Sequence, residues 1–287
     1  MSSDLGSRNW RDVSWVAFDT ETSGRYPIES QICEIAAVKW SAGGERETFQ
    51  SLVKPSKPMS DEVIAIHHIT NEMVANAPTI CEVLPKFLEF IRGSVLLAHH
   101  AQFDLGFVAA SLEECGLPLP SELTVCTSLL AQATVPETPN HRLQTLVPFF
   151  GVDPGQAHRA LDDARACLHV ALKIFERLQA EVVSPLTVDD IAAKMLRRSN
   201  ADLGTMKFAR FSMNALRANE SLVRFMAAAQ TQTPVQLVYK GGSRPGQPRE
   251  ILPIGIIRQL DGDALVAIES GEKVAKRYWI KDVQSIV

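Results

Sequence analysis

The stretch Val13-Ser14-Trp15-Val16-Ala17-Phe18-Asp19-Thr20-Glu21-Thr22-Ser23-Gly24 decides the fold, because an apolar run passes directly into two acids and a polar turn. The apolar run predicts a strand that ends at the turn. In a strand, residues i and i+2 point to one face roughly 7 Å apart, so Asp19 and Glu21 share a face. Like charges held this close repel, and a divalent cation between them relieves the repulsion. A strand that simply ends on polar turn residues is the alternative on this stretch alone.

The sequence around this stretch predicts a mixed α/β domain. Strand-like runs occur at residues 13–19, 32–40 and 47–53, separated by Gly, Pro and Ser clusters. After Pro58, helices are expected at 80–91, 103–115, 143–150 and 160–179, alternating with short strands at 95–98 and 123–126. We therefore predict a tail at 1–11 and, at 12–182, a domain with a mixed sheet flanked by helices.

The remainder of the chain predicts a second unit. Residues 183–232 read as a helical linker, with helices at 191–198 and 215–229. Residues 233–287 contain short runs rich in Val, Ile and Tyr at 235–239, 251–257, 264–268 and 277–280, with Gly and Asp turns between them. We expect a small β-barrel-like domain.

Composition narrows the class of protein. The chain has 287 residues, 46% of them hydrophobic and 22% charged, as in ordinary globular proteins of two domains. It has no apolar run long enough to span a bilayer and no visible targeting signal, so we expect a cytoplasmic protein without membrane association. Five scattered cysteines lack a C-x-x-C pair and predict reduced core residues rather than a zinc site: Cys33, Cys81, Cys115, Cys126 and Cys167.

The net charge of −4 conceals an asymmetry along the chain. Residues 1–204 carry 17 Lys and Arg against 26 Asp and Glu, a balance of −9, whereas residues 205–287 carry 12 against 7, a balance of +5. The basic part could follow a phosphate backbone, although Lys and Arg that merely solvate a small surface explain the same excess.

A third acid stands on an apolar helix face. If a helix begins near Gln102, Asp104 shares a face with Val108, Leu112 and Cys115. Burying an unpaired carboxylate is costly, so Asp104 should either cap the helix start or lie near a metal.

A fourth acid follows in His158-Arg159-Ala160-Leu161-Asp162-Asp163-Ala164. On the helix expected there, Asp163 shares a face with Cys167 and Val170 and points inward, whereas Asp162 faces water. His158 falls on the loop that enters the helix, from which it can reach the acids. Four acids and one histidine suffice for phosphodiester hydrolysis with two metal ions, the histidine removing the proton from a bound water.

These residues resemble the motifs of the DEDDh 3′-to-5′ exonucleases, a family with a ribonuclease H-like fold. The segment Phe18 to Gly24 is similar to F-D-x-E-T-T/S-G, the segment His99 to Asp104 to H-N-A-x-F-D, and the segment His158 to Asp163 to H-x-A-x-x-D. The motifs stand in the family's order, and the resemblance covers roughly residues 12–180. It implies a metal-dependent exonuclease that releases nucleoside 5′-monophosphates from a 3′ end.

The resemblance also implies roles for individual residues. Asp19, Glu21, Asp104 and Asp163 would hold two Mg²⁺ or Mn²⁺ ions, and His158 would be the general base. The segment His67-His68-Ile69-Thr70 is similar to the family's H-G-I-T loop, with His68 in place of Gly, and His100 stands where Asn is typical. The implied substrate contacts are Thr20, Thr22, His67, Ile69, His100 and Phe103.

The C-terminal part resembles WYL domains, small β-barrels of bacterial nucleic-acid-responsive regulators. The similar runs are 235–239, 249–255, 264–267 and 277–280, although Asp263-Ala264-Leu265 stands at the position of the Trp-Tyr-Leu triplet. The stretch 239–249 places an aromatic and three cations in an expected hairpin, which suits contacts to a single strand. The candidate contacts are Tyr239, Lys240, Arg244 and Arg249, and a solvated hairpin tip is the alternative.

The expected partner is nucleic acid, with single-stranded 3′ ends as substrate and a replication or repair protein as a further candidate. The rival function is a nucleic-acid-binding regulator that keeps the exonuclease fold without useful catalysis. An HD-type phosphohydrolase is remote because the chain has no His-Asp dyad. The choice between DNA and RNA depends on contacts to the 2′-OH and is open at this level.

Overall fold

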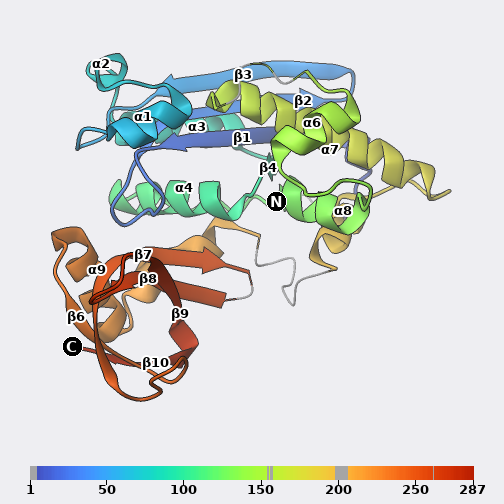
Figure 1. The fold of residues 1–287 in the computed structure, drawn as a ribbon. Coiled ribbons are helices and arrows are strands. Elements are labelled where there is room, and N and C mark those ends of the chain that lie inside the picture. Colours follow the sequence, from blue (N-terminus) through green and yellow to red (C-terminus); the bar gives the residue numbers. More distant parts are fainter. Residues whose placement is uncertain (1–4, 154, 156–157, 198–205, 261) are drawn as a thin grey trace.

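The computed structural model describes residues 5–153, 155, 158–197, 206–260 and 262–287. Figure 1 shows an α/β part, in blue to yellow, beside a C-terminal sheet in orange and red. The α/β part confirms the predicted ribonuclease H-like arrangement of a mixed sheet flanked by helices.

The first sheet has the strand order β3-β2-β1-β4-β5. Its strands are β1 (Trp15–Thr22), β2 (Ile32–Ser41), β3 (Gly44–Leu52), β4 (Val95–Ala98) and β5 (Thr124–Cys126). The central strand β1 pairs antiparallel with β2 and parallel with β4. The pairing with β4 ends at Ala17, so the acidic end of β1 extends beyond that neighbour. This leaves room beside Asp19 and Glu21 for side chains from other elements.

Helices pack on both faces of this sheet, with α7 on one face and α3 on the other. The helices of the α/β part are η1 (Trp10–Asp12), α1 (Asp61–His67), α2 (Asn71–Val74), α3 (Ile80–Ile91), α4 (Gln102–Glu114), α5 (Thr127–Thr134), α6 (Leu143–Phe150), α7 (Ala160–Ala180) and α8 (Val188–Leu196). Alternation along β1 sends Trp15 toward α7, where its ring lies 4.8 Å from that of Phe175. Phe18 points to the opposite face and lies 5.7 Å from Phe87 of α3. Asp19 and Glu21 continue the Trp15 face, so the alternation directs them toward α7.

The expected elements agree closely with those of the structure. The ranges predicted for α3, β4 and α6 are the observed ones, and α4 begins and ends one residue early. The predicted helix 191–198 corresponds to α8, which begins earlier, at Val188; residue 198 lies outside the described residues. The sequence reading missed the short helices α1, α2 and α5 and the last strand, β10.

The C-terminal part is an open sheet, and the expectation of a barrel-like domain was wrong on closure. It comprises η3 (Phe208–Phe211), η4 (Asn214–Leu216), α9 (Glu220–Thr231), β6 (Val235–Tyr239), β7 (Pro248–Gln259), β8 (Gly262–Glu269), β9 (Ala275–Trp279), η5 (Ile280–Asp282) and β10 (Val283–Ile286). The antiparallel order is β10-β6-β7-β8-β9, and within the described residues the two edge strands do not pair. The sequence shows strands and turns but not whether the first and last strands meet.

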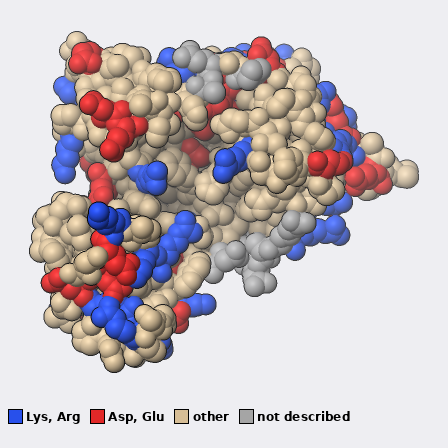
Figure 2. Space-filling view, in the orientation of Figure 1, with Lys and Arg blue, Asp and Glu red and all other residues tan. Residues whose placement is uncertain are grey.

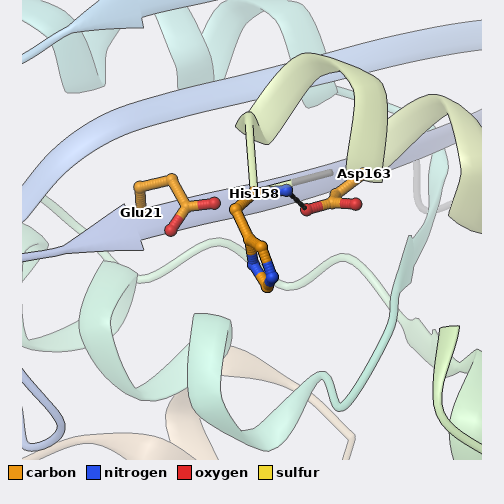
Figure 3. Close-up of side chains that lie close together, drawn as sticks. All are labelled: Glu21, His158 and Asp163. Carbon is orange, nitrogen blue, oxygen red and sulfur yellow. Dashed lines mark hydrogen bonds between the residues drawn. The ribbon is translucent and has the colours of Figure 1, made fainter. Parts of the chain in front are cut away.

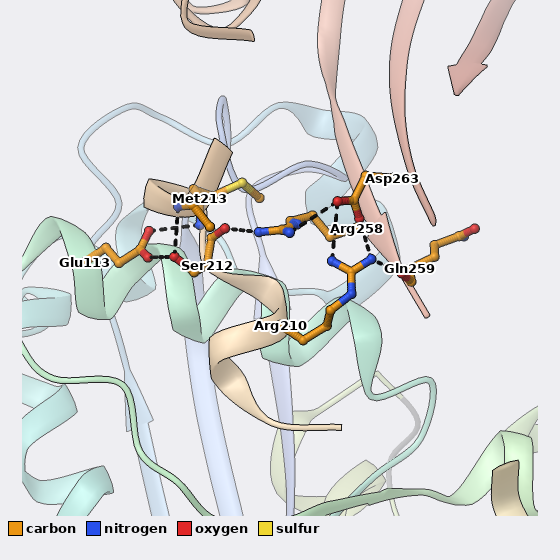
Figure 4. A network of polar contacts seen from close by, with 8 residues as sticks. Glu113, Arg210, Ser212, Met213, Arg258, Gln259 and Asp263 are labelled. Carbon is orange, nitrogen blue, oxygen red and sulfur yellow. Dashed lines mark hydrogen bonds and ion pairs between the residues drawn. The ribbon is translucent and has the colours of Figure 1, made fainter. Parts of the chain in front are cut away.

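A polar network ties this sheet to α4 (Figure 4). Glu113 near the end of α4 accepts hydrogen bonds from the backbone N–H groups that begin η4, at 3.0 Å each. Arg258 of β7 pairs with Asp263 at 3.2 Å. It also donates a hydrogen bond to the backbone carbonyl of Ser212, two residues before η4 begins. The labelled members of the network are Glu113, Arg210, Ser212, Met213, Arg258, Gln259 and Asp263. The helix that carries Asp104 therefore also anchors the C-terminal sheet.

The cysteines differ from the expectation of five reduced core residues. Cys81 of α3 and Cys115, which follows α4, form a disulfide. Cys33, Cys126 and Cys167 are free and buried. The pairing follows from the packing of α3 against α4, which the spacing of the two cysteines along the chain does not reveal. In the described part of the chain, no helix has the length and apolarity needed to cross a membrane.

Candidate active site

Four acids predicted from the sequence influence one another electrostatically at the end of β1. Burial raises the pKa of Asp19 well above its usual range, and the carboxylates of Asp104, Glu21 and Asp163 raise it further. Burial and, next, the charge of Asp163 raise the pKa of Glu21 to about 8. Arg159 offsets part of the rise at Glu21 and His158 part of the rise at Asp163, and the raised pKa values still indicate an excess of negative charge in the cluster.

Asp104 is almost fully buried, at 2% exposure, and is held by the central strand. Its Oδ1 accepts hydrogen bonds from the backbone N–H of Thr20 at 3.0 Å and from the Thr20 hydroxyl at 2.8 Å. Burial raises the pKa of Asp104 to about 7, and the two bonds from Thr20 partly offset that rise. Thr20 thus ties the start of α4 to β1 and fixes the carboxylate of Asp104 next to the acids of the strand.

Glu21, His158 and Asp163 form the tightest group (Figure 3). Each offers a potential metal-ligating atom, and these atoms all lie within 4.8 Å of one another. The backbone N–H of His158 donates to Asp163 Oδ2 at 2.9 Å, while its imidazole is exposed to solvent. His158 has a φ of 62°, which turns the chain into α7 and leaves the ring beside the two carboxylates. Burial raises the pKa of Asp163, although the His158 N–H partly offsets it.

Glu34 of β2 is a buried acid that the sequence reading missed. It has no exposed surface, lies opposite Glu21 in the strand register and forms an ion pair with Arg159 at 2.8 Å. Its carboxylate also accepts hydrogen bonds from Gln50 Nε2 and from the backbone N–H of Ala160, the first residue of α7. Burial alone would raise the pKa of Glu34, but the bonds from Arg159 and Gln50 lower it below the ordinary value. A lone acid within the apolar run 32–38 was the signal that could have found it.

A cavity of about 400 Å³ opens onto the acids. It is lined by Asp19, His99, His100, Ser128, Gln132, His141, Arg142, Leu143, Gln144 and Asp163. His99 holds one wall, because its two ring nitrogens bond to Thr127 Oγ1 at 2.8 Å and to the carbonyl of His141 at 3.0 Å. Burial lowers the pKa of His99 to about 4, so this ring stays neutral. The sequence analysis predicted no element for residues 127–142, which include the short helix α5.

Several residues expected to touch the substrate lie inside the protein instead. Ile69 has no exposed surface and packs with Cys33 and Val74, and its expected contact with a nucleotide base stays a prediction. His67 is 1% exposed, and its ring accepts a hydrogen bond from the backbone N–H of Ile69. Thr22 is also buried and donates to a backbone carbonyl in its own turn. These three side chains are buried within the protein.

Two further residues among the implied substrate contacts are accessible to solvent. His100 is exposed and lines the cavity, and Phe103 is half-buried at the start of α4. His68, in place of the family's Gly, ends α1 with a φ of 61°, and His100 has a φ of 64°. Both histidines therefore occupy left-handed conformations, which Gly and Asn adopt most readily.

The basic hairpin also differs from its predicted form. Tyr239 is 8% exposed and its ring packs edge-on against Tyr278, 5.3 Å away. Arg249 is 5% exposed and donates to the carbonyl of Arg244, whose own side chain pairs with Glu269. Tyr239 and Arg249 are thus buried residues of the C-terminal sheet, and their expected contacts to a nucleic-acid strand stay predictions. Lys240 is exposed.

Comparison with known proteins adds to this geometry. A family model described as "Exonuclease" matches residues 16–171. DNA polymerase III subunit epsilon of Treponema pallidum (strain Nichols) is 41% identical over 160 residues, 55% of this chain and 74% of that protein. DNA polymerase III PolC-type of Caldanaerobacter subterraneus subsp. tengcongensis is 38% identical over 185 residues, 64% of this chain but only 13% of that protein. The solved structure of exonuclease X in complex with 5′ overhanging duplex DNA matches with a TM-score of 0.50 and 29% identity, covering 63% of this chain and 99% of that one.

Proposed function

The chain belongs to the exonuclease family, and from this premise we propose that it is a metal-dependent 3′-to-5′ exonuclease acting on nucleic acid. It would hydrolyse the terminal phosphodiester bond and release nucleoside 5′-monophosphates. The observation that carries the proposal is the convergence of Asp19, Glu21, Asp104 and Asp163 beside the exposed imidazole of His158. The raised pKa values of these acids support a site that takes up positive charge.

The donor set fits two Mg²⁺ or Mn²⁺ ions, since hard oxygen ligands with excess negative charge are what these cations prefer. Asp19, Glu21, Asp104 and Asp163 would hold them. When bound, such ions neutralise the phosphate and lower the pKa of a coordinated water.

The protein's own groups supply the remaining functions. His158 would accept the proton of the attacking water, because its ring is exposed and lies beside the carboxylates of Glu21 and Asp163. Thr20 orients Asp104 through two hydrogen bonds. Glu34 holds the first residue of α7, the helix that carries Asp163. Preorganised carboxylates avoid reorganisation during the reaction.

A degradation assay tests the proposal. Matched single- and double-stranded DNA and RNA, each labelled at the 5′ end or the 3′ end, are incubated in Mg²⁺ or Mn²⁺. We expect a ladder from 5′-labelled strands and labelled mononucleotide from 3′-labelled strands. Asp19→Ala should remove both products while the folded circular dichroism spectrum remains. Activity retained by purified Asp19→Ala protein, or mononucleotide released from the 5′ end, contradicts the proposal. Association with a replication or repair protein stays a prediction.

A further inference from the structure

A second cavity, of about 310 Å³, lies between the α/β part and the C-terminal sheet. His100, two residues before α4, lines both this cavity and the one that opens onto the acids, so the two cavities adjoin at this residue. The loop after β1 contributes Arg25 and Tyr26, α4 contributes Phe103, and the C-terminal sheet contributes residues of β7 and Arg277 of β9. We call this space the interdomain cavity.

The interdomain cavity has the electrostatic character opposite to that of the catalytic cluster. Its lining includes three arginines and, among the described residues, no carboxylate. Arg258 is already paired with Asp263, but the side chains of Arg25 and Arg277 are exposed and make no hydrogen bond or ion pair within the described residues. Figure 2 shows basic side chains on both sides of the hollow that separates the α/β part from the C-terminal sheet. Two unpaired guanidinium groups next to an acidic catalytic site fit a polyanion.

Aromatic rings accompany these cations. Tyr26 and Phe103 are both half-buried and line the interdomain cavity. Phe103 packs against Phe107, with ring centroids 4.8 Å apart, which fixes its orientation. Aromatic rings beside basic side chains are the combination that binds single-stranded nucleic acid, because every base can stack on a ring.

The position of the cavity walls is fixed by packing. A Cβ at Gly255 of β7 would lie 2.5 Å from the Cβ and Cγ of Tyr26, so only Gly allows the loop after β1 to approach β7 this closely. The network around Glu113 holds the C-terminal sheet to α4 from the other side. The cavity is therefore preformed, which reduces the ordering cost of binding.

We propose that the interdomain cavity binds the single strand immediately 5′ of the nucleotide that the catalytic site removes. Arg25 and Arg277 would contact its phosphates, and Tyr26 and Phe103 its bases. The volume lies at the lower end of roughly 300–1,000 Å³ for small-ligand sites, so the cavity has room for a short segment of a strand. This inference rests on the proposed function, and it assigns strand binding to this cavity instead of to the hairpin at 239–249.

Binding is measured by fluorescence anisotropy with a 5′-fluorescein dT12 strand. All proteins carry Asp163→Asn, so no sample degrades the probe. Arg25→Ala and Arg277→Ala are compared with Arg224→Ala, which removes an exposed arginine of α9 outside the cavity lining. We expect several-fold weaker binding for each cavity variant and near-parental binding for the control. The salt slope of log Kd should fall in magnitude by about 0.7 for each lost phosphate contact.

A kinetic experiment distinguishes a failure of this inference from a failure of the proposed function. In the otherwise unchanged chain, hydrolysis of the p-nitrophenyl ester of thymidine 5′-monophosphate reports the catalytic site, and degradation of dT12 reports strand binding as well. The Arg25→Ala/Arg277→Ala double variant should lose at least tenfold more kcat/KM on dT12 than on the ester. If it binds dT12 as tightly as Arg224→Ala does, or loses both activities equally, the inference is overturned. If the wild-type chain hydrolyses neither substrate, the proposed function fails, and the anisotropy comparison still decides the inference.

Discussion

Glu34 of β2 and Arg159, the residue before α7, form an ion pair at 2.8 Å between positions 125 residues apart in the chain. A second bond, from Arg159 Nε to the other carboxylate oxygen at 3.2 Å, makes the pair bidentate. The same carboxylate accepts the N–H of Ala160. One buried acid thus fixes the start of the helix that carries Asp163 and the turn that presents His158.

Glu34→Ala should lower both stability and turnover. It leaves the Arg159 guanidinium and the Ala160 N–H without their acceptor, which costs about 2–4 kcal/mol because the acid is fully buried. Urea unfolding measures the free energy, and kcat on a single strand measures the effect on the site. Glu45→Ala is the matched control, since its pair with Arg165 is one-third exposed on both sides and contributes about 0–1 kcal/mol. Equal losses for the two variants would contradict a positioning role for Glu34.

The acid cluster should make the metal-free protein less stable as pH rises. Glu21 has a pKa of about 8 in the folded protein against an ordinary value of 4.5, so the folded state binds more protons than the unfolded state in this window. Stability therefore falls from about pH 4.5 to pH 8. Mg²⁺ needs ionised carboxylates, so its stabilising effect should grow over the same range.

Thermal unfolding at pH 5.5 and pH 8, in EDTA or in Mg²⁺, measures both effects. Glu21→Gln removes this titration, and we expect a smaller drop in metal-free Tm between the two pH values and a smaller gain from Mg²⁺. A metal-free Tm that rises with pH in the wild-type protein would show that the carboxylates are not held protonated by the fold.

His158→Asn should reduce turnover by about 10²–10⁴-fold with little change in stability. Asn is suitable because it tolerates the left-handed conformation at φ 62° and keeps the backbone N–H that bonds to Asp163. The alternative role is metal ligation, since the imidazole lies within 4.8 Å of Glu21 and Asp163 ligand atoms. Single-turnover rates and Mg²⁺ titration distinguish the two. Losses of similar size in rate and in Mg²⁺ affinity would identify His158 as a ligand rather than a base.

Periodicity explains why much of the site could be predicted from the sequence. Strand alternation alone places Asp19 and Glu21 on one face, and helix periodicity places Asp104 and Asp163 on apolar faces that must turn inward. Local patterns also gave the bounds of α3, β4 and α6. Features that depend only on the spacing of residues within one segment could therefore be predicted from the sequence.

The features that were missed depend on contacts between distant segments. The partner of Glu34 is 125 residues away, and the disulfide needs the packing of α3 on α4. Tyr239 looked like an exposed hairpin residue because its packing partner, Tyr278, lies on another strand. Spacing along the chain carries no information on such pairs.

The Cys81–Cys115 disulfide should stabilise the α3–α4 packing. It closes a loop with a sequence separation of 34, for which the chain-entropy model gives about 3–4 kcal/mol. Urea unfolding with and without dithiothreitol measures this contribution, and Cys81→Ser/Cys115→Ser should be insensitive to the reductant. Alkylation of the unfolded, unreduced protein should modify three thiols, those of Cys33, Cys126 and Cys167. Five modified thiols would show that the bond does not form.

Gly255→Ala should separate the loop after β1 from the C-terminal sheet, whereas Gly106→Ala should be harmless. The new Cβ at Gly255 would lie 2.5 Å from Tyr26 Cβ, an atom close to the backbone, so the loop itself must move, at a cost of about 1–3 kcal/mol. At Gly106 of α4 the Cβ would meet Pro27 at an ordinary 3.7 Å, and Ala should gain about 0.4–1 kcal/mol through helix propensity and a less flexible unfolded chain. Urea unfolding compares the two, and amide hydrogen exchange over residues 23–31 reports the loop. Faster exchange in Gly255→Ala alone would locate the effect at this contact, and equal exchange in both variants would contradict close packing of Tyr26 on β7.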